Sequence, residues 1–137
     1  MTRFLQVATV CSAVLFASPL RAELIDIDNG KLEALIEQGV PVIDVRRAEE
    51  WQQTGVIENS KLQTFFDKKG RYDAPGWFAA LEATVDTAEP FILICHSGGR
   101  SSMIGKWLGK QLPTVYNVED GIVKWLAEKR PVVAVKP

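Results

Sequence analysis

Short apolar runs alternate with amphipathic stretches along most of the chain. The apolar runs are rich in Val, Ile, Leu and Phe, and Pro, Gly, Asp or Asn bound most of them, which is typical of buried strands. Between them, apolar residues recur at the spacing of one helix face. Alternating strands and helices predict an α/β fold, with a parallel sheet covered on both faces. We expect strands at 23–27, 40–45, 60–64, 91–94 and 114–118 and helices at 31–38, 48–53, 77–85, 101–112 and 121–129.

The run at 91–94 leads into the stretch that carries most of the chemical information. Cys95 follows it directly, and after two polar residues Gly98-Gly99-Arg100 opens a helical pattern. A strand, a tight glycine loop and a helix N-terminus together form a cradle of backbone N–H groups that favours an anion. A thiol in such a cradle is favoured as a thiolate nucleophile. The alternative is that Cys95 is a small core residue. Core packing alone does not call for two glycines and an arginine directly after it, so we favour the nucleophile.

Composition and charge restrict the function classes further. The 137 residues contain 47% hydrophobic residues and four Trp, enough for one domain with a substantial core. The net charge is −1 with acids and bases interspersed, which does not indicate a nucleic-acid-binding surface. His96 is the only histidine, so we expect no metal site and no cofactor.

Residues 1–22 have the features of a secretory signal. Arg3 is followed by a mostly apolar stretch from 5 to 20, and Ala22 fits the residue before a cleavage site. The stretch is short against the ~20 residues of a spanning helix, although an uncleaved anchor is the alternative. We expect an exported, periplasmic protein without stable membrane association after cleavage. The remaining domain, 23–137, has 14 bases, 17 acids and Cys95 as its one cysteine.

Three ordered motifs resemble those of the rhodanese-like sulfurtransferases. The loop from Cys95 to Ser101 is similar to the family's active-site loop, Cys-x-x-Gly-x-Arg-Ser/Thr. Val42–Arg46, followed by Glu49-Glu50-Trp51, resembles its Asp-Val-Arg strand and Glu-aromatic helix, and Val115–Trp125 resembles its closing strand and Gly-Ile-x-x-Trp helix. The chain departs from the family's frequent Gly-His-Ile at Gly55-Val56-Ile57.

The resemblance implies a five-stranded parallel sheet and transfer of sulfane sulfur through a Cys95 persulfide. The donor would be a compound such as thiosulfate, and the acceptor would be cyanide, a small thiol or a protein thiol. The resemblance assigns the substrate-binding loop to His96, Ser97, Gly98, Gly99, Arg100 and Ser101. Arg100 fits a loop brace, because a guanidinium does not give up a proton.

Asp44 ends a predicted strand, where α/β folds place site residues. It is either a supporting carboxylate that positions loops or a catalytic acid, and the family comparison implies the first. Arg46 is interpreted as a surface or ion-pair residue rather than a substrate ligand.

Spacing favours sulfur over phosphate as the transferred group. Arg100 is the fifth residue after Cys95, one fewer than in most cysteine-based phosphatases, so the cradle should suit a single sulfur atom. A sulfur carrier or interaction module without catalysis is the alternative function, and a phosphatase or arsenate reductase is remote. A dithiol oxidoreductase would need a resolving cysteine. The irregular stretch 65–76 is either a wall or lid of the pocket, or a surface loop with its aromatics in the core.

Overall fold

The computed structural model describes residues 23–137. The signal peptide predicted at 1–22 lies outside the described residues, and so does the alternative of an uncleaved anchor. Within 23–137, every helix is too short or too polar to cross a membrane.

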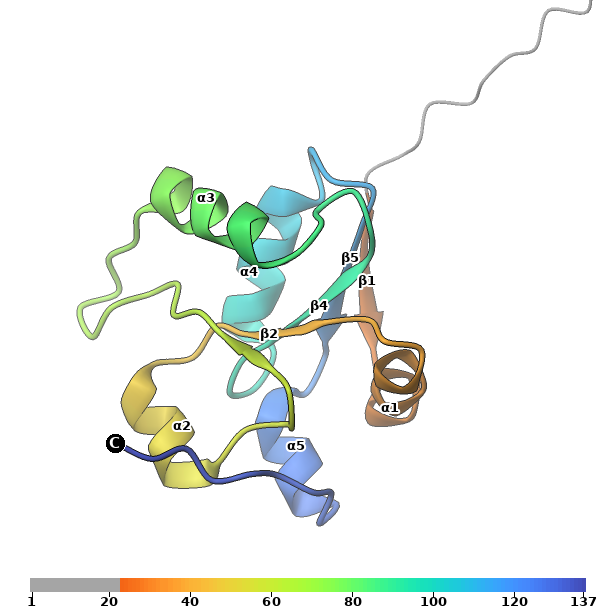
Figure 1. Cartoon of the computed structure of the whole chain (residues 1–137), viewed down its shortest axis with the longest axis vertical. Helices are drawn as coiled ribbons and strands as arrows, with labels where there is room; N and C mark the ends of the chain where they lie inside the picture. The colour runs from red at the N-terminus through yellow and green to blue at the C-terminus, as the bar shows by residue number, and fades with distance from the viewer. Residues whose placement is uncertain (1–22) are drawn as a thin grey trace, which may run out of the picture.

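Within residues 23–137 the chain forms a five-stranded sheet and five helices, as the sequence predicted (Figure 1). Every strand pair is parallel, and the strand order is β1-β5-β4-β2-β3. The strands are β1 (Glu23–Ile27), β2 (Val42–Asp44), β3 (Lys61–Leu62), β4 (Phe91–Ile94) and β5 (Thr114–Val118). The helices are α1 (Asn29–Glu37), α2 (Ala48–Thr54), α3 (Ala74–Thr84), α4 (Gly99–Leu108) and α5 (Gly121–Ala127).

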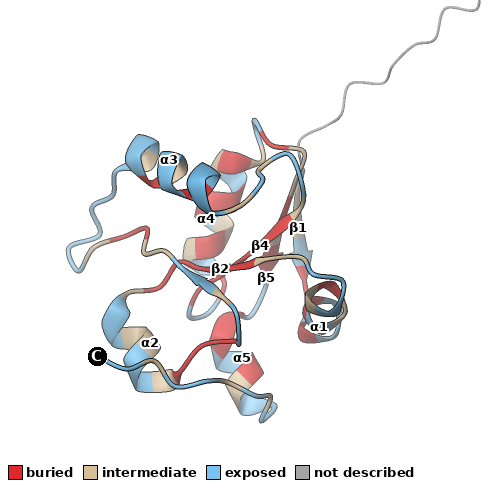
Figure 2. Ribbon diagram, in the orientation of Figure 1, coloured by how far each residue is buried: buried red, intermediate tan, exposed pale blue. Residues whose placement is uncertain are grey.

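The central strand β4 divides two hydrophobic layers. Its four side chains are fully buried and alternate between the faces of the sheet. Phe91 and Leu93 pack with residues of α3 and α4, whereas Ile92 and Ile94 pack with residues of α1 and α5. Figure 2 shows the buried positions on β2, β4 and β5 and on the helix sides that face them. Helices therefore cover both faces, as expected.

Several element boundaries differ from the expected ones. Helix α3 starts at Ala74 rather than at residue 77, because the Asp73 carboxylate caps it by accepting the Gly76 N–H and Pro75 fits the first turn. Helix α4 ends at Leu108 rather than at 112, with Gly109 as its C-cap. The predicted strands 40–45 and 60–64 shorten to β2 and β3, and the predicted helix 121–129 ends at residue 127.

The C-terminal segment packs on the body of the domain. Val133 and Val56 form an antiparallel bridge with two N–H···O bonds of 3.0 and 2.8 Å. The indole N–H of Trp125 donates to the carbonyl of Pro131 at 2.9 Å. Val132 packs against the layer that contains α1 and α5.

Candidate active site

Cys95 lies where the fold brings a strand end and a helix N-terminus together. It directly follows β4, and the loop closes at Gly98, which has a left-handed φ of 95° and is the N-cap of α4. The Cys95 sulfur accepts a hydrogen bond from the Gly98 N–H at 3.1 Å. The Ser101 hydroxyl lies 3.2 Å from the same sulfur and 3.2 Å from the Gly98 carbonyl, so its single proton is shared between two acceptors. Of the expected cradle of backbone N–H groups, one N–H, that of Gly98, reaches the sulfur, and the Ser101 hydroxyl is the second donor.

Helix α5 holds the outer side of this loop. The carbonyls of Cys95 and His96 accept hydrogen bonds from the N–H groups of Ile122 and Val123, at 2.9 and 3.1 Å. Backbone packs on backbone here: a Cβ on Gly121 would overlap the His96 carbonyl oxygen. His96 and Ser97 are exposed, whereas the Cys95 residue is only 1% exposed. The loop is thus fixed from both sides and shows solvent two polar residues in front of a buried sulfur.

Arg100 is held by Glu50 of α2. The two guanidinium nitrogens donate to the two carboxylate oxygens at 2.9 and 2.6 Å, and the Arg47 N–H donates a third hydrogen bond of 3.0 Å to the Glu50 carboxylate. The Arg100 hydrogen bonds lower the pKa of Glu50 to about 2, and the same pair raises the pKa of Arg100. The geometry is that of a brace between α4 and α2. The sequence did not predict this role for Glu50, because no local pattern indicates that it pairs with a residue 50 positions later in the chain.

Asp44 is the last residue of β2 and pairs in the sheet with Ile94, the residue before Cys95. Its carboxylate accepts hydrogen bonds of 2.9 and 2.7 Å from the Arg46 guanidinium and of 3.1 Å from the Arg46 N–H. Both side chains are buried, with 0% and 1% exposed. Arg46 also donates to the Thr54 hydroxyl at 2.8 Å and to the Gly55 carbonyl at 3.0 Å, which ties down the end of α2. The ion pair expected for Arg46 is present, but in the core rather than at the surface.

These features match a known family. Residues 28–128 match the family model of the Rhodanese-like domain. The chain belongs to the rhodanese-like family. It is 32% identical over 111 residues to YtwF of Bacillus subtilis, whose name assigns it provisionally to the sulfurtransferases, with 80% of this chain and 97% of that protein covered. It is 27% identical over 96 residues to the thiosulfate sulfurtransferase GlpE of Pseudomonas savastanoi, covering 69% and 80% of the two chains. A rhodanese-related protein of Thermoplasma volcanium shares the fold, with a TM-score of 0.62, 26% identity and 81% and 99% of the chains covered.

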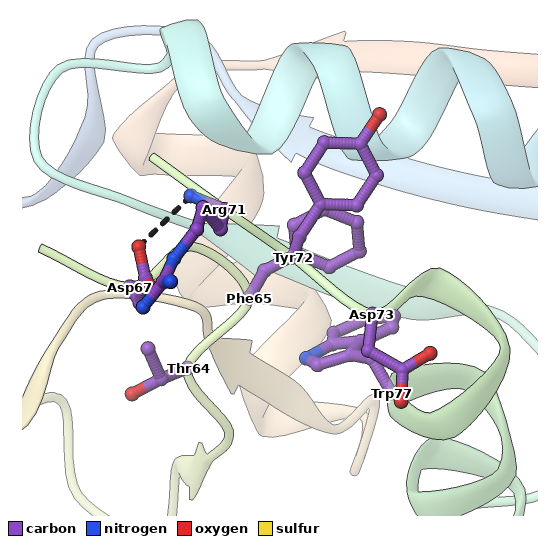
Figure 3. Close-up of a pocket in the computed structure, with 7 residues that line it drawn as sticks. All are labelled: Thr64, Phe65, Asp67, Arg71, Tyr72, Asp73 and Trp77. Atoms are coloured by element: carbon purple, nitrogen blue, oxygen red, sulfur yellow. Dashed lines mark hydrogen bonds and ion pairs between the residues drawn. The ribbon is translucent and has the colours of Figure 1, made fainter. Parts of the chain in front are cut away.

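The segment between β3 and α3 forms one wall of the rhodanese-like domain's site region. Phe65 and Phe66 are buried in the core, and the exposed Tyr72 stacks on Phe65 at 5.1 Å between ring centroids. This segment and Trp77 of α3 line a hollow of about 430 Å³. Figure 3 shows the lining residues, with Arg71 bonded to Asp67. A second hollow, of about 410 Å³, reaches Arg100. Phe65 and Phe66 thus follow the second interpretation, a surface loop with aromatics in the core, while the segment also lines the hollow that contains Arg100.

Replacing Glu50 with a neutral residue should lower the free energy of unfolding of the rhodanese-like domain, and the size of this loss should depend on pH. Because folding lowers the pKa of this carboxyl from 4.5 to about 2, its stabilising effect is present above about pH 4.5 and is lost as the pH falls towards 2. Glu50→Gln should lower the free energy of unfolding at pH 7 by about 1 kcal/mol, a value reduced by partial exposure. Urea unfolding at several pH values should show this gap closing below pH 4.5.

The neighbouring Glu49 supplies the matched control for that measurement. It lies on the same helix turn but is exposed, and it pairs with Arg47 and with the exposed Lys68. Glu49→Gln should therefore give a smaller gap at pH 7 than Glu50→Gln. Equal losses in the free energy of unfolding for the two variants would contradict the conclusion that the Glu50–Arg100 pair stabilises the domain more than the pairs of Glu49.

Proposed function

We propose that this domain is a sulfurtransferase that carries sulfane sulfur on Cys95. The single observation that carries the proposal is the Cys95 sulfur itself, which accepts hydrogen bonds within a glycine loop at the start of α4. Those donors favour the anionic sulfur of a thiolate and then of a persulfide. The similarity to proteins named as sulfurtransferases supports the same reaction class. The role given to each loop residue is part of the proposal.

In the loading step the Cys95 thiolate attacks the outer sulfur of the donor. With thiosulfate, a new S–S bond to Cys95 forms as the S–S bond of thiosulfate breaks, and sulfite leaves with the electron pair. The two negative charges of thiosulfate are thus conserved in sulfite, and the charge of the thiolate moves to the persulfide. No proton transfer is required. The Gly98 N–H and the Ser101 hydroxyl are placed to stabilise the sulfur anion.

In the unloading step a thiophilic acceptor attacks the outer sulfur of the persulfide. Cyanide forms thiocyanate, a thiolate forms a new persulfide, and in both cases Cys95 leaves as a thiolate. Arg100 contributes positive charge and braces the loop through Glu50. Asp44 positions the loops through Arg46 rather than acting as an acid, because its hydrogen-bonding capacity is used by that residue.

The test is to incubate the domain, residues 23–137, with thiosulfate and no acceptor, and to measure its intact mass. We expect a gain of one sulfur atom, which disappears as thiocyanate forms on addition of cyanide. Cys95→Ser should gain no sulfur and form no thiocyanate. If the unmodified protein gains no sulfur from thiosulfate or from a more reactive organic persulfide, the proposal is wrong.

The burial of Cys95 favours a second candidate, a sulfur carrier without turnover. Cys95 as a whole residue is only 1% exposed, which limits the access of a dissolved acceptor to it. Such a carrier would accept one sulfur atom and then release it slowly to cyanide or small thiols. The amount of thiocyanate formed after cyanide is added in that experiment distinguishes the two candidates. An enzyme forms many equivalents per protein molecule, and a carrier forms about one.

His96 is placed to influence the choice of donor. It is exposed and follows Cys95 directly, so that its imidazole stands where a donor approaches the loop. Replacing it with alanine should change the ratio of the loading rate from thiosulfate to the loading rate from an organic persulfide. Persulfide formation itself should remain. Identical donor ratios for both proteins at every pH between about 5 and 8 would contradict this prediction.

We also propose that the protein is exported and loses residues 1–22. The basic start, the apolar stretch and Ala22 support this. Expression of the full chain in bacteria, followed by periplasmic extraction and mass measurement, should give a chain that begins at Glu23. Intact full-length protein in the membrane fraction would indicate an uncleaved anchor instead.

A further inference from the structure

An apolar groove lies along α4, the helix that follows the Cys95 loop. Six residues of the segment before α3, of α3 and of α4 line a hollow of about 230 Å³, which we call the Met103 groove: Phe65, Tyr72, Ala74, Met103, Ile104 and Trp107. Met103 also lines the 410 Å³ hollow that contains Arg100. Arg100 lies in the first turn of α4, five residues after Cys95. A molecule that occupies both hollows therefore extends from the groove to the end of α4 that follows the Cys95 loop.

The groove exposes apolar surface that the domain itself does not cover. Tyr72 is 59% exposed and Met103 is 56% exposed, the highest values among the large hydrophobic residues of 23–137. Aromatic packing fixes the walls: Tyr72 stacks on Phe65, and the Trp107 ring lies 6.4 Å from the Phe65 ring. Figure 3 shows Tyr72 extending from its loop towards α4. The groove is thus formed before anything binds to it.

The size and chemistry of the groove fit an amino-acid side chain. Drug-sized ligands and cofactors occupy pockets of about 300–1,000 Å³, more than the 230 Å³ present here. Tyr, Trp and Met are enriched where proteins contact each other, and Met adapts to different partners. Cyanide and inorganic donors have no apolar part for such a groove. A peptide segment, unlike these small molecules, has the length and the apolar side chains to occupy both the groove and the neighbouring hollow.

Basic residues adjoin the groove, although the domain carries more acids than bases. Lys68, which pairs with Glu49, lines the neighbouring hollow together with Arg47 and Arg100. Lys69 follows it in the chain, and Lys106 stands on α4 between the groove residues Met103 and Trp107 in sequence; both are exposed. The acids of the wall segment are already used, since Asp67 bonds Arg71 and Asp73 caps α3. Among residues 23–137, Lys69 and Lys106 form no ion pair. The charge around the groove is complementary to an acidic segment.

We propose that the sulfur acceptor is a protein thiol, presented by a segment that carries a large apolar residue and acidic residues near its cysteine. The apolar side chain enters the Met103 groove, the acidic residues face the lysines that adjoin it, and the cysteine reaches Cys95. The acceptor thiolate attacks the outer sulfur of the Cys95 persulfide. A persulfide forms on the acceptor, and the Cys95 thiolate leaves. This inference rests on the proposed function, because it specifies the acceptor of that same reaction.

The test uses the loaded domain and short synthetic peptides with one cysteine. Each peptide carries two Asp residues and a Phe at one of several offsets from the cysteine, and its matched partner carries Ser in place of Phe. The initial rate of peptide persulfide formation is followed by mass spectrometry. At the best offset we expect the Phe peptide to react about tenfold faster, as partial burial of one aromatic side chain allows. Replacing the two Asp by Lys should slow the reaction, and added salt should reduce that difference.

Protein variants determine whether the preference arises in the groove. In the double variant Tyr72→Ser, Met103→Ser, the ratio of the Phe rate to the Ser rate should fall to about one. Leu62→Ser is the matched control, because Leu62 is an exposed apolar residue, 38% accessible, on the edge strand β3. It should keep the ratio of the unmodified domain. Because both peptides are compared on the same protein, the ratio does not depend on how much of a variant is folded.

The outcomes separate this inference from the proposed function. A domain that neither gains sulfur nor releases it to cyanide overturns the proposed function. A domain that gains sulfur and releases it to cyanide, but shows no Phe preference at any offset, overturns the protein-acceptor inference alone. That inference is also overturned if the double variant keeps the preference, or if Leu62→Ser loses it.

Discussion

Replacing Gly98 with alanine is expected to remove most sulfur loading while leaving the cysteine in place. Gly98 has a φ of 95°, where a residue with a Cβ is strained, and the added Cβ would overlap the Glu119 carbonyl oxygen. Relief requires the loop or the connection from β5 to α5 to move. Because misplacement by about 1 Å can slow a reaction about a hundredfold, we expect a loss of that size in the loading rate.

The same variant should lose at least about 2 kcal/mol of stability, from backbone strain together with overpacking. The measurements are the rate of mass gain with thiosulfate and the urea dependence of unfolding. Gly39→Ala is the matched control, since Gly39 also has a positive φ, 84°, but nothing lies within 4 Å of an added Cβ. It should lose only the strain contribution, about 1 kcal/mol, and load normally. Equal losses in both variants would show that the close contact with Glu119 does not matter.

Asp44→Asn should cause the largest loss of stability among the single charge changes considered. The substitution keeps the shape of the side chain but leaves the Arg46 guanidinium, 0% exposed, without its counter-charge. Removing one partner of a buried ion pair costs about 3–5 kcal/mol, which lowers the melting temperature of a domain of this size by about 10 °C or more. Calorimetry or thermal unfolding followed by circular dichroism measures this directly.

A second substitution tests the cause of that loss. The double variant Asp44→Leu, Arg46→Met removes both charges, and replacing a buried pair by apolar residues is often neutral. It should recover a large part of the stability, with some loss remaining because Arg46 also bonds Thr54 and the Gly55 carbonyl. Asp67→Asn, in the exposed pair with Arg71, should have little effect.

The activity of Asp44→Asn distinguishes the two roles considered for this carboxylate. A supporting residue predicts that loading follows the fraction of folded protein, so that the folded variant loads almost as fast as the unmodified domain. A catalytic acid predicts a large loss of rate in a variant that is still fully folded at the assay temperature. The second result would contradict the positioning role proposed here.

The sequence predicted those parts of the fold that local patterns determine. Strand β4 matches its expected range because it is a contiguous apolar run, and β1 and β5 match theirs although each apolar pattern is interrupted by a polar residue, Asp26 and Asn117. Strand β3 shortens to two exposed residues, since an edge strand has little burial to mark it. The start of α3 was missed because Ala-Pro-Gly is typical of a loop, whereas here the Asp73 cap makes it a first turn.

The candidate site also has parts that the sequence predicted and parts that it did not. The Cys95 loop was identifiable because its glycines and helix start are contiguous in the chain. The Glu50 brace and the burial of Arg46 were not, since each depends on which segments the sheet brings together. The exposure of Tyr72 and Met103 likewise belongs to the assembled surface. The sequence shows only that both residues are largely apolar, not that both are exposed.

The pairing of β1 with β5 has a consequence for how the chain acquires its structure. The Asn117 amide bonds the Asp26 carboxylate at 2.8 Å, across 91 residues, within the strand pair that completes the sheet. Such a distant contact forms late and slowly, because most of the intervening chain must first be ordered. A newly made chain lacks this closing strand pair until β5 has been synthesised. For the export proposed above, that interval is the time in which the chain could pass through a translocation channel, before the sheet closes.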